Sequence, residues 1–171
     1  MGLIMAPMRP QKYLMWLALA AVLVLLDLWT KHLATVNLEL YRPIEVTSWL
    51  NMTLAHNSGA AFSFLAGAGG WQRWFFTIVA IAISIVLMVW LWRLPNRSRL
   101  LPVAISLVLG GAIGNVIDRV RFGYVVDFID VHVGGWHWPA FNLADSVIVI
   151  GVILLLIEGF IPRRGPEPPR L

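Results

Sequence analysis

Acidic side chains gather in one stretch of a chain that is otherwise strongly apolar. Four of the nine acidic residues, Asp118, Asp127, Asp130 and Asp145, lie between positions 110 and 145. Two carboxylates held a few ångströms apart cannot both ionise cheaply, so they share one proton. One then acts as a general base on water and the other as a general acid, which suits hydrolysis of a peptide bond without a metal. Asp127, just beyond the third apolar run, and Asp145, in the first turn of the fourth, are positioned for this chemistry.

Other catalytic chemistries lack their residues in this sequence. There is no cysteine, no HExxH zinc motif, no G-x-S-x-G nucleophile turn and no phosphate-binding P-loop. The four histidines, His32, His56, His132 and His137, do not have metal-ligand spacing, and we expect them at interfaces rather than on a metal. The sequence therefore predicts no metal and no organic cofactor.

Two other interpretations of the acidic residues stay open at this point. The same aspartates would suit an ion or proton path in a small transporter, or interface ion pairs in a structural membrane subunit. A transport path should run through the whole membrane, whereas the second and third apolar runs have no polar centre. The halves of the first and fourth runs that lie away from these acids offer only Glu158, near an end. A structural subunit does not account for Asn and Asp residues gathering at one face.

The composition requires a membrane to cover the apolar surface. The chain is 59% hydrophobic and 13% charged, with a mean hydropathy of +0.77, so it is predicted to be an integral membrane protein. Apolar runs at about 13–36, 71–92, 100–120 and 141–161 are long enough to span a core about 30 Å thick. The predicted fold is an all-α bundle of four transmembrane helices in a single domain, residues 1–171, with an uncleaved first span.

Two segments between these runs cannot cross the membrane as helices. Residues 37–70 contain β-branched and alternating patterns that predict a small β-cradle on the membrane surface. They also contain the small-residue motif NSGAAFS at 57–63, which permits close backbone approach. Residues 121–140 are predicted to form a second loop on the same side.

Basic residues orient the bundle. Eight of the 13 lysines and arginines lie on the side that both termini share: Arg9, Lys12, Arg93, Arg97, Arg99, Arg163, Arg164 and Arg170. By the positive-inside rule this side is cytoplasmic. The two non-spanning segments then face the periplasm, where five polar positions converge: Asp27, Asn57, Asp118, Asp127 and Asp145.

Polar residues in the first and third spans fall on single helical faces. Asp27 and Lys31 are four residues apart, and they form either a local ion pair at the interface or an inward face that braces the site. Asn115, Asp118 and Arg119 repeat this spacing, so Asp118 is expected either to pair with Arg119 at a helix end or to support the site.

Five motifs together make the chain resemble bacterial lipoprotein signal peptidase, also called signal peptidase II. They are DLWTK at 27–31, NSGAAFS at 57–63, GGAIGNVIDR at 110–119, VVDF at 125–128 and FNLADS at 141–146. They occur in the family's order and extend over about 13–161. The first motif departs from the family at Leu28, where glutamine is usual.

The resemblance implies a membrane aspartyl peptidase that removes the signal peptide from diacylglyceryl-modified prolipoproteins, just before the lipid-modified cysteine. It implies that Asp127 and Asp145 are the catalytic dyad. Support or substrate binding is implied for Asn57, Gly59, Asn115, Asp118, Arg119, Asn142, Asp27 and Lys31. Implied partners are lipidated prolipoproteins, membrane lipids and the inhibitor globomycin, with no nucleic acid, and a monomer in the bacterial inner membrane is expected. Asp130 matches no required acid of the family and is expected to be a solvated loop charge.

Overall fold

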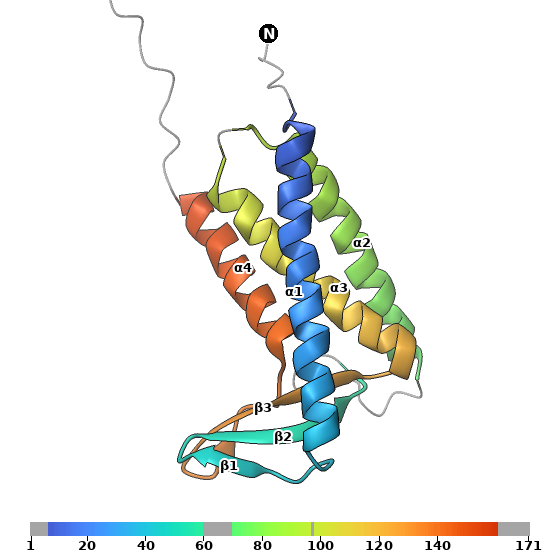
Figure 1. Cartoon of the computed structure of the whole chain (residues 1–171), viewed down its shortest axis with the longest axis vertical. Helices are drawn as coiled ribbons and strands as arrows, with labels where there is room; N and C mark the ends of the chain where they lie inside the picture. The colour runs from blue at the N-terminus through green and yellow to red at the C-terminus, as the bar shows by residue number, and fades with distance from the viewer. Residues whose placement is uncertain (1–6, 60–69, 97, 161–171) are drawn as a thin grey trace, which may run out of the picture.

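Four long helices form the body of the protein (Figure 1). The computed structural model describes residues 7–59, 70–96 and 98–160. Its helices are α1 (Pro10–Asn37), α2 (Trp71–Arg93), α3 (Leu100–Phe122) and α4 (Leu143–Phe160). Each is long and apolar enough to cross a membrane, so the predicted four-helix class is confirmed and the protein is a multi-pass membrane protein.

Helix α3 is the packing centre of the bundle. Most of its residues are buried, and it contacts each of the other three helices. Small residues permit this closeness: a Cβ added at Gly111 would collide with the Ala144 carbonyl oxygen of α4, and one at Gly114 would lie 2.5 Å from Asp27 Oδ2 of α1. The glycines of α3 therefore bring α1 and α4 against the helix that carries Asn115 and Asp118.

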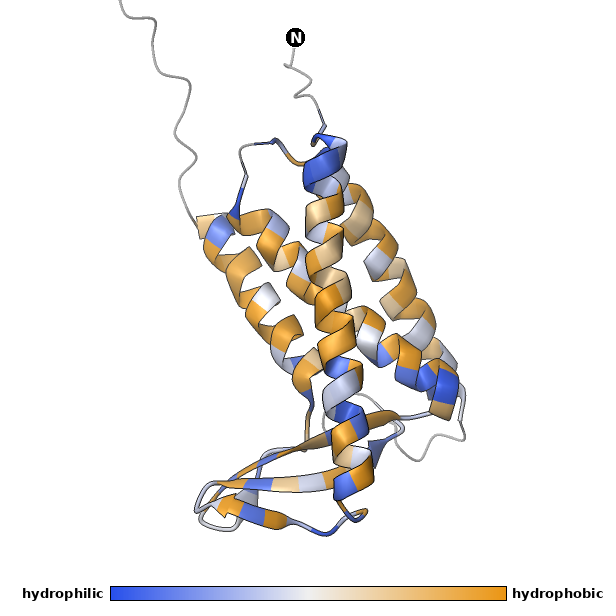
Figure 2. Cartoon of the chain, in the orientation of Figure 1, coloured by the Kyte–Doolittle hydropathy of each residue, from blue (hydrophilic) through white to orange (hydrophobic). Residues whose placement is uncertain are grey.

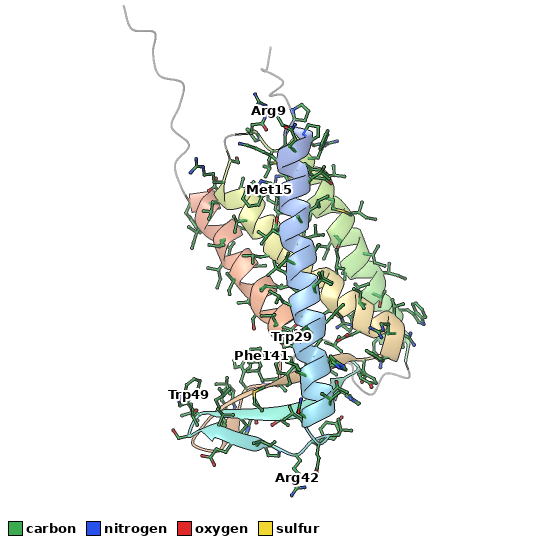
Figure 3. All side chains as sticks on the ribbon, in the orientation of Figure 1. Arg9, Met15, Trp29, Arg42, Trp49 and Phe141 are labelled. Atoms are coloured by element: carbon green, nitrogen blue, oxygen red, sulfur yellow. The ribbon has the colours of Figure 1, made fainter. Side chains whose placement is uncertain are left out.

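The outer faces of α1, α2 and α4 are apolar and uncovered by protein. Large exposed side chains include Leu25, Ile78, Val86, Val149 and Leu156. In Figure 2 hydrophobic residues run along most of the length of the helices, and hydrophilic ones collect near their ends and on the sheet. Figure 3 shows side chains projecting outward from the ribbon along the helices. These apolar faces are suited to contact with the lipid hydrocarbon and not with water.

A four-stranded antiparallel sheet lies at one end of the bundle (Figure 1). Its order is β1 (Ile44–Thr47), β2 (Leu50–Asn57), β3 (Val125–Val133) and β4 (Trp136–His137). The cradle predicted within 37–70 supplies only β1 and β2; the segment predicted as a loop at 121–140 supplies β3 and β4. Residues 60–63 of the NSGAAFS motif lie outside the described residues.

The sheet is attached to the bundle by a small apolar cluster and by covalent continuity. Ala34 of α1 packs with Leu54 of β2 and with Val126 and Phe128 of β3. Strand β3 follows α3 through Gly123, whose positive φ of 88° ends the helix in the left-handed conformation that glycine favours. As a result β3 crosses the end of α1 and runs beside the start of α4.

Candidate active site

The two aspartates of the predicted dyad are joined through one asparagine. Asp127 is on β3 and is 2% exposed, and Asp145 is in the first turn of α4. The Asn142 side chain donates from Nδ2 to Asp127 Oδ1 at 2.7 Å, and its backbone N–H donates to Asp145 Oδ2 at 3.3 Å. The structure thus brings together two carboxylates that are 18 positions apart in the chain.

Burial and the neighbouring carboxylate change the acidity of Asp127. Removal from water, and then the negative charge of Asp145, raise the pKa of Asp127 from 3.8 to about 7, against the opposing hydrogen bonds from Asn57 and Asn142. Asp127 consequently exchanges its proton near neutral pH, as an acid in a shared-proton pair must.

A capping box explains why Asp145 is where it is. The Asn142 side chain accepts a hydrogen bond from the Asp145 backbone N–H at 2.9 Å, while Asp145 accepts from the Asn142 N–H. This reciprocal pair caps α4 at Asn142, the residue directly before the helix begins. It leaves the Asp145 carboxylate at a helix N-terminus, where the helix dipole favours a negative charge.

Each carboxylate also accepts from a second asparagine. Asn57, the last residue of β2, donates from Nδ2 to Asp127 Oδ2 at 3.0 Å and accepts from the Gly59 N–H through Oδ1. Asn115 of α3 donates from Nδ2 to Asp145 Oδ1 at 2.8 Å. The side-chain amides are therefore neutral donors held directly against the dyad.

A buried ion cluster lies behind the asparagines. Lys31 of α1 is 2.8 Å from Asp27 Oδ2 and 2.9 Å from Asp118 Oδ2, and it donates to Asn115 Oδ1 at 2.9 Å. All three charged side chains are almost completely buried. Asp27 and Lys31 do form a local ion pair, but the pair is buried and faces inward instead of lying at the interface. Among the described residues Asp118 forms its ion pair with Lys31 and not with the adjacent Arg119.

The two acids of this cluster also hold the backbone beside the dyad. Asp118 Oδ2 accepts from the N–H of Val126, the residue before Asp127, at 3.1 Å. Asp27 Oδ1 accepts from the N–H of Ala144, the residue before Asp145, at 2.9 Å. One lysine therefore forms ion pairs with both carboxylates that fix the two halves of the site.

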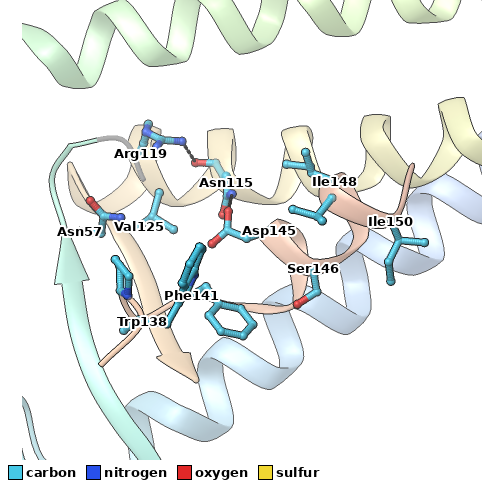
Figure 4. A pocket seen from close by; sticks show the side chains of 13 residues that line it. Asn57, Asn115, Arg119, Val125, Trp138, Phe141, Asp145, Ser146, Ile148 and Ile150 are labelled. Atoms are coloured by element: carbon cyan, nitrogen blue, oxygen red, sulfur yellow. Dashed lines mark hydrogen bonds between the residues drawn. The ribbon is translucent and has the colours of Figure 1, made fainter. Parts of the chain in front are cut away.

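A cavity of about 640 Å³ opens beside Asp145 (Figure 4). Its lining comprises Asn57, Asn115, Arg119, Val125, Trp138, Pro139, Ala140, Phe141, Asp145, Ser146, Ile148, Val149 and Ile150. One end carries the amides and Asp145, and the other is aliphatic side chains of α4. Asp127 is not itself among the lining residues, but Asn57, which donates to Asp127 Oδ2, is one of them.

Every site residue predicted from the sequence lies in or next to this arrangement. Arg119 donates through long hydrogen bonds to the carbonyl oxygens of Asn115, at 3.4 Å, and Gly59, at 3.3 Å. Arg119 and Gly59, the remaining two predicted residues, are thereby connected to the site. The expectation for Asp130 was wrong. Asp130 is 7% exposed and accepts from Asn51 and His137, because three strands close around it.

Sequence reasoning missed the wall of the cavity. Trp138, Pro139, Ala140 and Phe141 line it, but none has a side chain that suggests catalysis. The available signal was their position, directly before Asn142 and within a run of aromatic residues interrupted by proline. The backbone N–H groups of Val126 and Ala144 left no signal in residue type.

Comparison with known proteins finds relatives over most of the chain. A family model described as signal peptidase (SPase) II matches residues 19–161. The lipoprotein signal peptidase of Acinetobacter baumannii strain ATCC 17978 is 55% identical over 155 residues, which cover 90% of this chain and 88% of that protein. The lipoprotein signal peptidase of Citrobacter koseri is 48% identical over 151 residues, covering 88% and 93%. A solved structure described as a bacterial membrane enzyme, at 2.3 Å resolution, aligns with a TM-score of 0.74 at 35% identity over 90% of each chain.

Proposed function

The chain belongs to the signal peptidase II family, and on this premise we propose that it uses Asp127 and Asp145 as the catalytic dyad of an aspartic peptidase. Its activity is the cleavage of signal peptides from prolipoproteins. The observation that carries the dyad assignment is Asn142, which bonds to both carboxylates and so fixes them as one unit. We also propose that the chain is a single membrane domain, in which Asp27, Lys31 and Asp118 brace the dyad.

The surroundings of the two aspartates support different roles for them. Asp145 accepts two hydrogen bonds at a helix N-terminus and borders the cavity, so we assign it the role of general base. Asp127 has a pKa of about 7 and retains its proton near neutral pH, which suits the general acid.

The reaction follows from these roles. Asp145 removes a proton from a water molecule as the water oxygen attacks the scissile carbonyl carbon, and Asp127 donates its proton to the carbonyl oxygen. The tetrahedral intermediate then collapses, with Asp145 returning a proton to the leaving nitrogen and Asp127 regaining its own from the hydroxyl. Both carboxyl groups end in their starting states, so the dyad turns over without any further reactant.

The cavity supports a lipid-modified substrate. Its polar end at Asp145 suits a peptide backbone, and its aliphatic end at Ile148, Val149 and Ile150 faces the region where lipid covers α4. We therefore assign to this chain prolipoproteins with a diacylglyceryl-modified cysteine, cut just before that cysteine. Globomycin is expected to occupy the same cavity.

The placement of charge supports an orientation for the site. The start of α1, which carries Arg9 and Lys12, and the end of α2, which carries Arg93, lie at the end of the bundle opposite the sheet. By the positive-inside rule this supports a cytoplasmic location for that end, and a periplasmic location for the dyad. Both carboxylates and the asparagines that bond to them belong to one chain, which supports a monomer as the active form.

The deciding experiment is cleavage by the purified chain in detergent. The substrates are a diacylglyceryl-modified prolipoprotein and its unlipidated form, each with and without EDTA, and the variant is Asp127→Asn. We expect EDTA-insensitive cleavage of the lipidated form alone, and none by the variant. Normal turnover by a folded Asp127→Asn protein would remove Asp127 from the dyad. Absence of cleavage by folded wild-type protein would overturn the peptidase assignment, and ion flux in proteoliposomes would then test the transporter alternative.

A further inference from the structure

A second buried carboxylate lies on β3, three residues beyond Asp127. Asp130 is 7% exposed and accepts from Asn51 Nδ2 at 3.1 Å. His137 Nδ1 is 2.8 Å from Asp130 Oδ1 and 3.0 Å from Oδ2, so the imidazole is within hydrogen-bond distance of both oxygens. These residues, which we call the Asp130 cluster, come from β2, β3 and β4 and connect the three strands.

The cluster holds its carboxylate in the charged form. Burial opposes ionisation of Asp130, but the hydrogen bonds from His137 and Asn51 and the nearby imidazoles prevail and lower its pKa. The ring of His132 stacks on His137 with centroids 5.0 Å apart, which restricts the rotation of the imidazole. A buried carboxylate that is paired and held in this way fixes the relative positions of the strands that carry its partners.

The cluster stands at one end of the cavity wall, and the dyad stands at the other. After His137 the chain runs back along β3, with the Trp138 N–H donating to Val131 O at 2.8 Å and the Phe141 N–H to Ile129 O at 3.0 Å. It then reaches Asn142, which bonds to both dyad carboxylates. Residues 138–141, between the two anchors, line the cavity.

We propose that His137 is a positioning residue, which through Asp130 holds the 138–141 wall in the shape that receives the lipid-bearing part of the substrate. The inference rests on the proposed function, because it assigns the cavity to that substrate. The dyad end of the wall has its own anchors in Asn142 and in the bond from Val126 to Asp118. Loss of His137 should therefore loosen the wall and leave the reacting groups in place.

The kinetic test separates these two ends. His137→Ala is expected to raise KM for the lipidated substrate about three- to tenfold, the range for one lost hydrogen bond, while kcat changes less than twofold. His137→Asn should restore most of the lost affinity, because its amide N–H can occupy the place of Nδ1. The matched control is His32→Ala, since His32 is exposed on α1 away from the wall. An unchanged KM in His137→Ala, or no rescue by His137→Asn, would overturn the role.

A measurement without substrate keeps the two proposals distinguishable. In His137→Ala we expect faster deuterium uptake by a peptide covering 134–142, and unchanged uptake by α3, because the bond from Trp138 to Val131 opens more often. Unchanged uptake by 134–142 in His137→Ala would overturn the positioning role, whatever the KM of this variant. If wild-type protein failed to cleave, the proposed function would fall, and this exchange experiment would still decide whether His137 fixes the wall.

Discussion

Replacement of Asp127 by asparagine should abolish cleavage and, at neutral to alkaline pH, make the protein more stable. In the folded protein the pKa of Asp127 is raised to about 7 by burial and by Asp145, whereas its model value is 3.8. A raised pKa stabilises the folded state fully below the unfolded value and loses that contribution as pH rises through the folded value. Asparagine does not titrate, so it avoids this loss.

The size of the effect follows from the shift. Three pKa units correspond to about 4 kcal/mol, of which the part between pH 5 and pH 8 is about 2.7 kcal/mol. The asparagine NH₂ also faces a donor from Asn57 or Asn142, which costs about 1 kcal/mol at every pH. The difference in Tm between Asp127→Asn and wild type should therefore move in favour of the variant by roughly 5–10 °C from pH 5 to pH 8.

The assay is thermal unfolding in detergent at pH 5, 6, 7 and 8, followed by intrinsic fluorescence. Asp130→Asn is the matched control, because Asp130 is on the same strand but its pKa is lowered. A lowered pKa contributes stability above the unfolded value and loses it only in acid, so this variant should have a lower Tm than wild type throughout the range. A Tm difference for Asp127→Asn that does not change with pH would refute the view that ionising Asp127 is costly.

Three further predictions concern the rate, the ion cluster and the helix contact. The ratio kcat/KM should fall about tenfold per pH unit above about 7, because Asp127 must keep its proton to act as the acid, and a pH–rate profile flat to pH 9 would contradict this. Lys31→Met should lower the free energy of unfolding by about 3–5 kcal/mol, because two buried carboxylates lose their cation; a wild-type Tm would argue against it. Gly111→Ala should cost about 1–3 kcal/mol and most of the activity by pushing α4 off α3 at Ala144, whereas Gly159→Ala, where a Cβ meets nothing within 4 Å, should leave cleavage rates unchanged.

The helices of this protein were readable from sequence because lipid imposes a simple requirement. A segment that crosses must be long and apolar, and hydropathy reports both properties directly. The convergence of polar residues at one face was also predictable, since it needs only the order of the spans and the side of the basic residues. Neither prediction depends on which helix contacts which other helix.

The partners of individual side chains were not readable, because they depend on contacts between distant residues. Lys31 meets Asp118, 87 positions away, only because the glycines of α3 admit α1. The burial of Asp130 depends on Asn51 and His137 arriving from separate strands. The run 125–133 has the β-branched residues that favour a strand. It forms β3 only because β2, from a distant part of the chain, pairs with it.

The arrangement of donors around the dyad has a chemical consequence. Within the described parts of the chain, the groups that donate to Asp127 and Asp145 are side-chain amides and backbone N–H groups, and Lys31 is one asparagine farther away. A lysine or arginine bonded directly to Asp127 would favour its carboxylate and lower its pKa, so that no proton would be left to donate near neutral pH. Asparagines hold the same positions without adding charge. Lys31, placed behind Asn115, can therefore stabilise the fold of the site and leave the shared proton to the dyad.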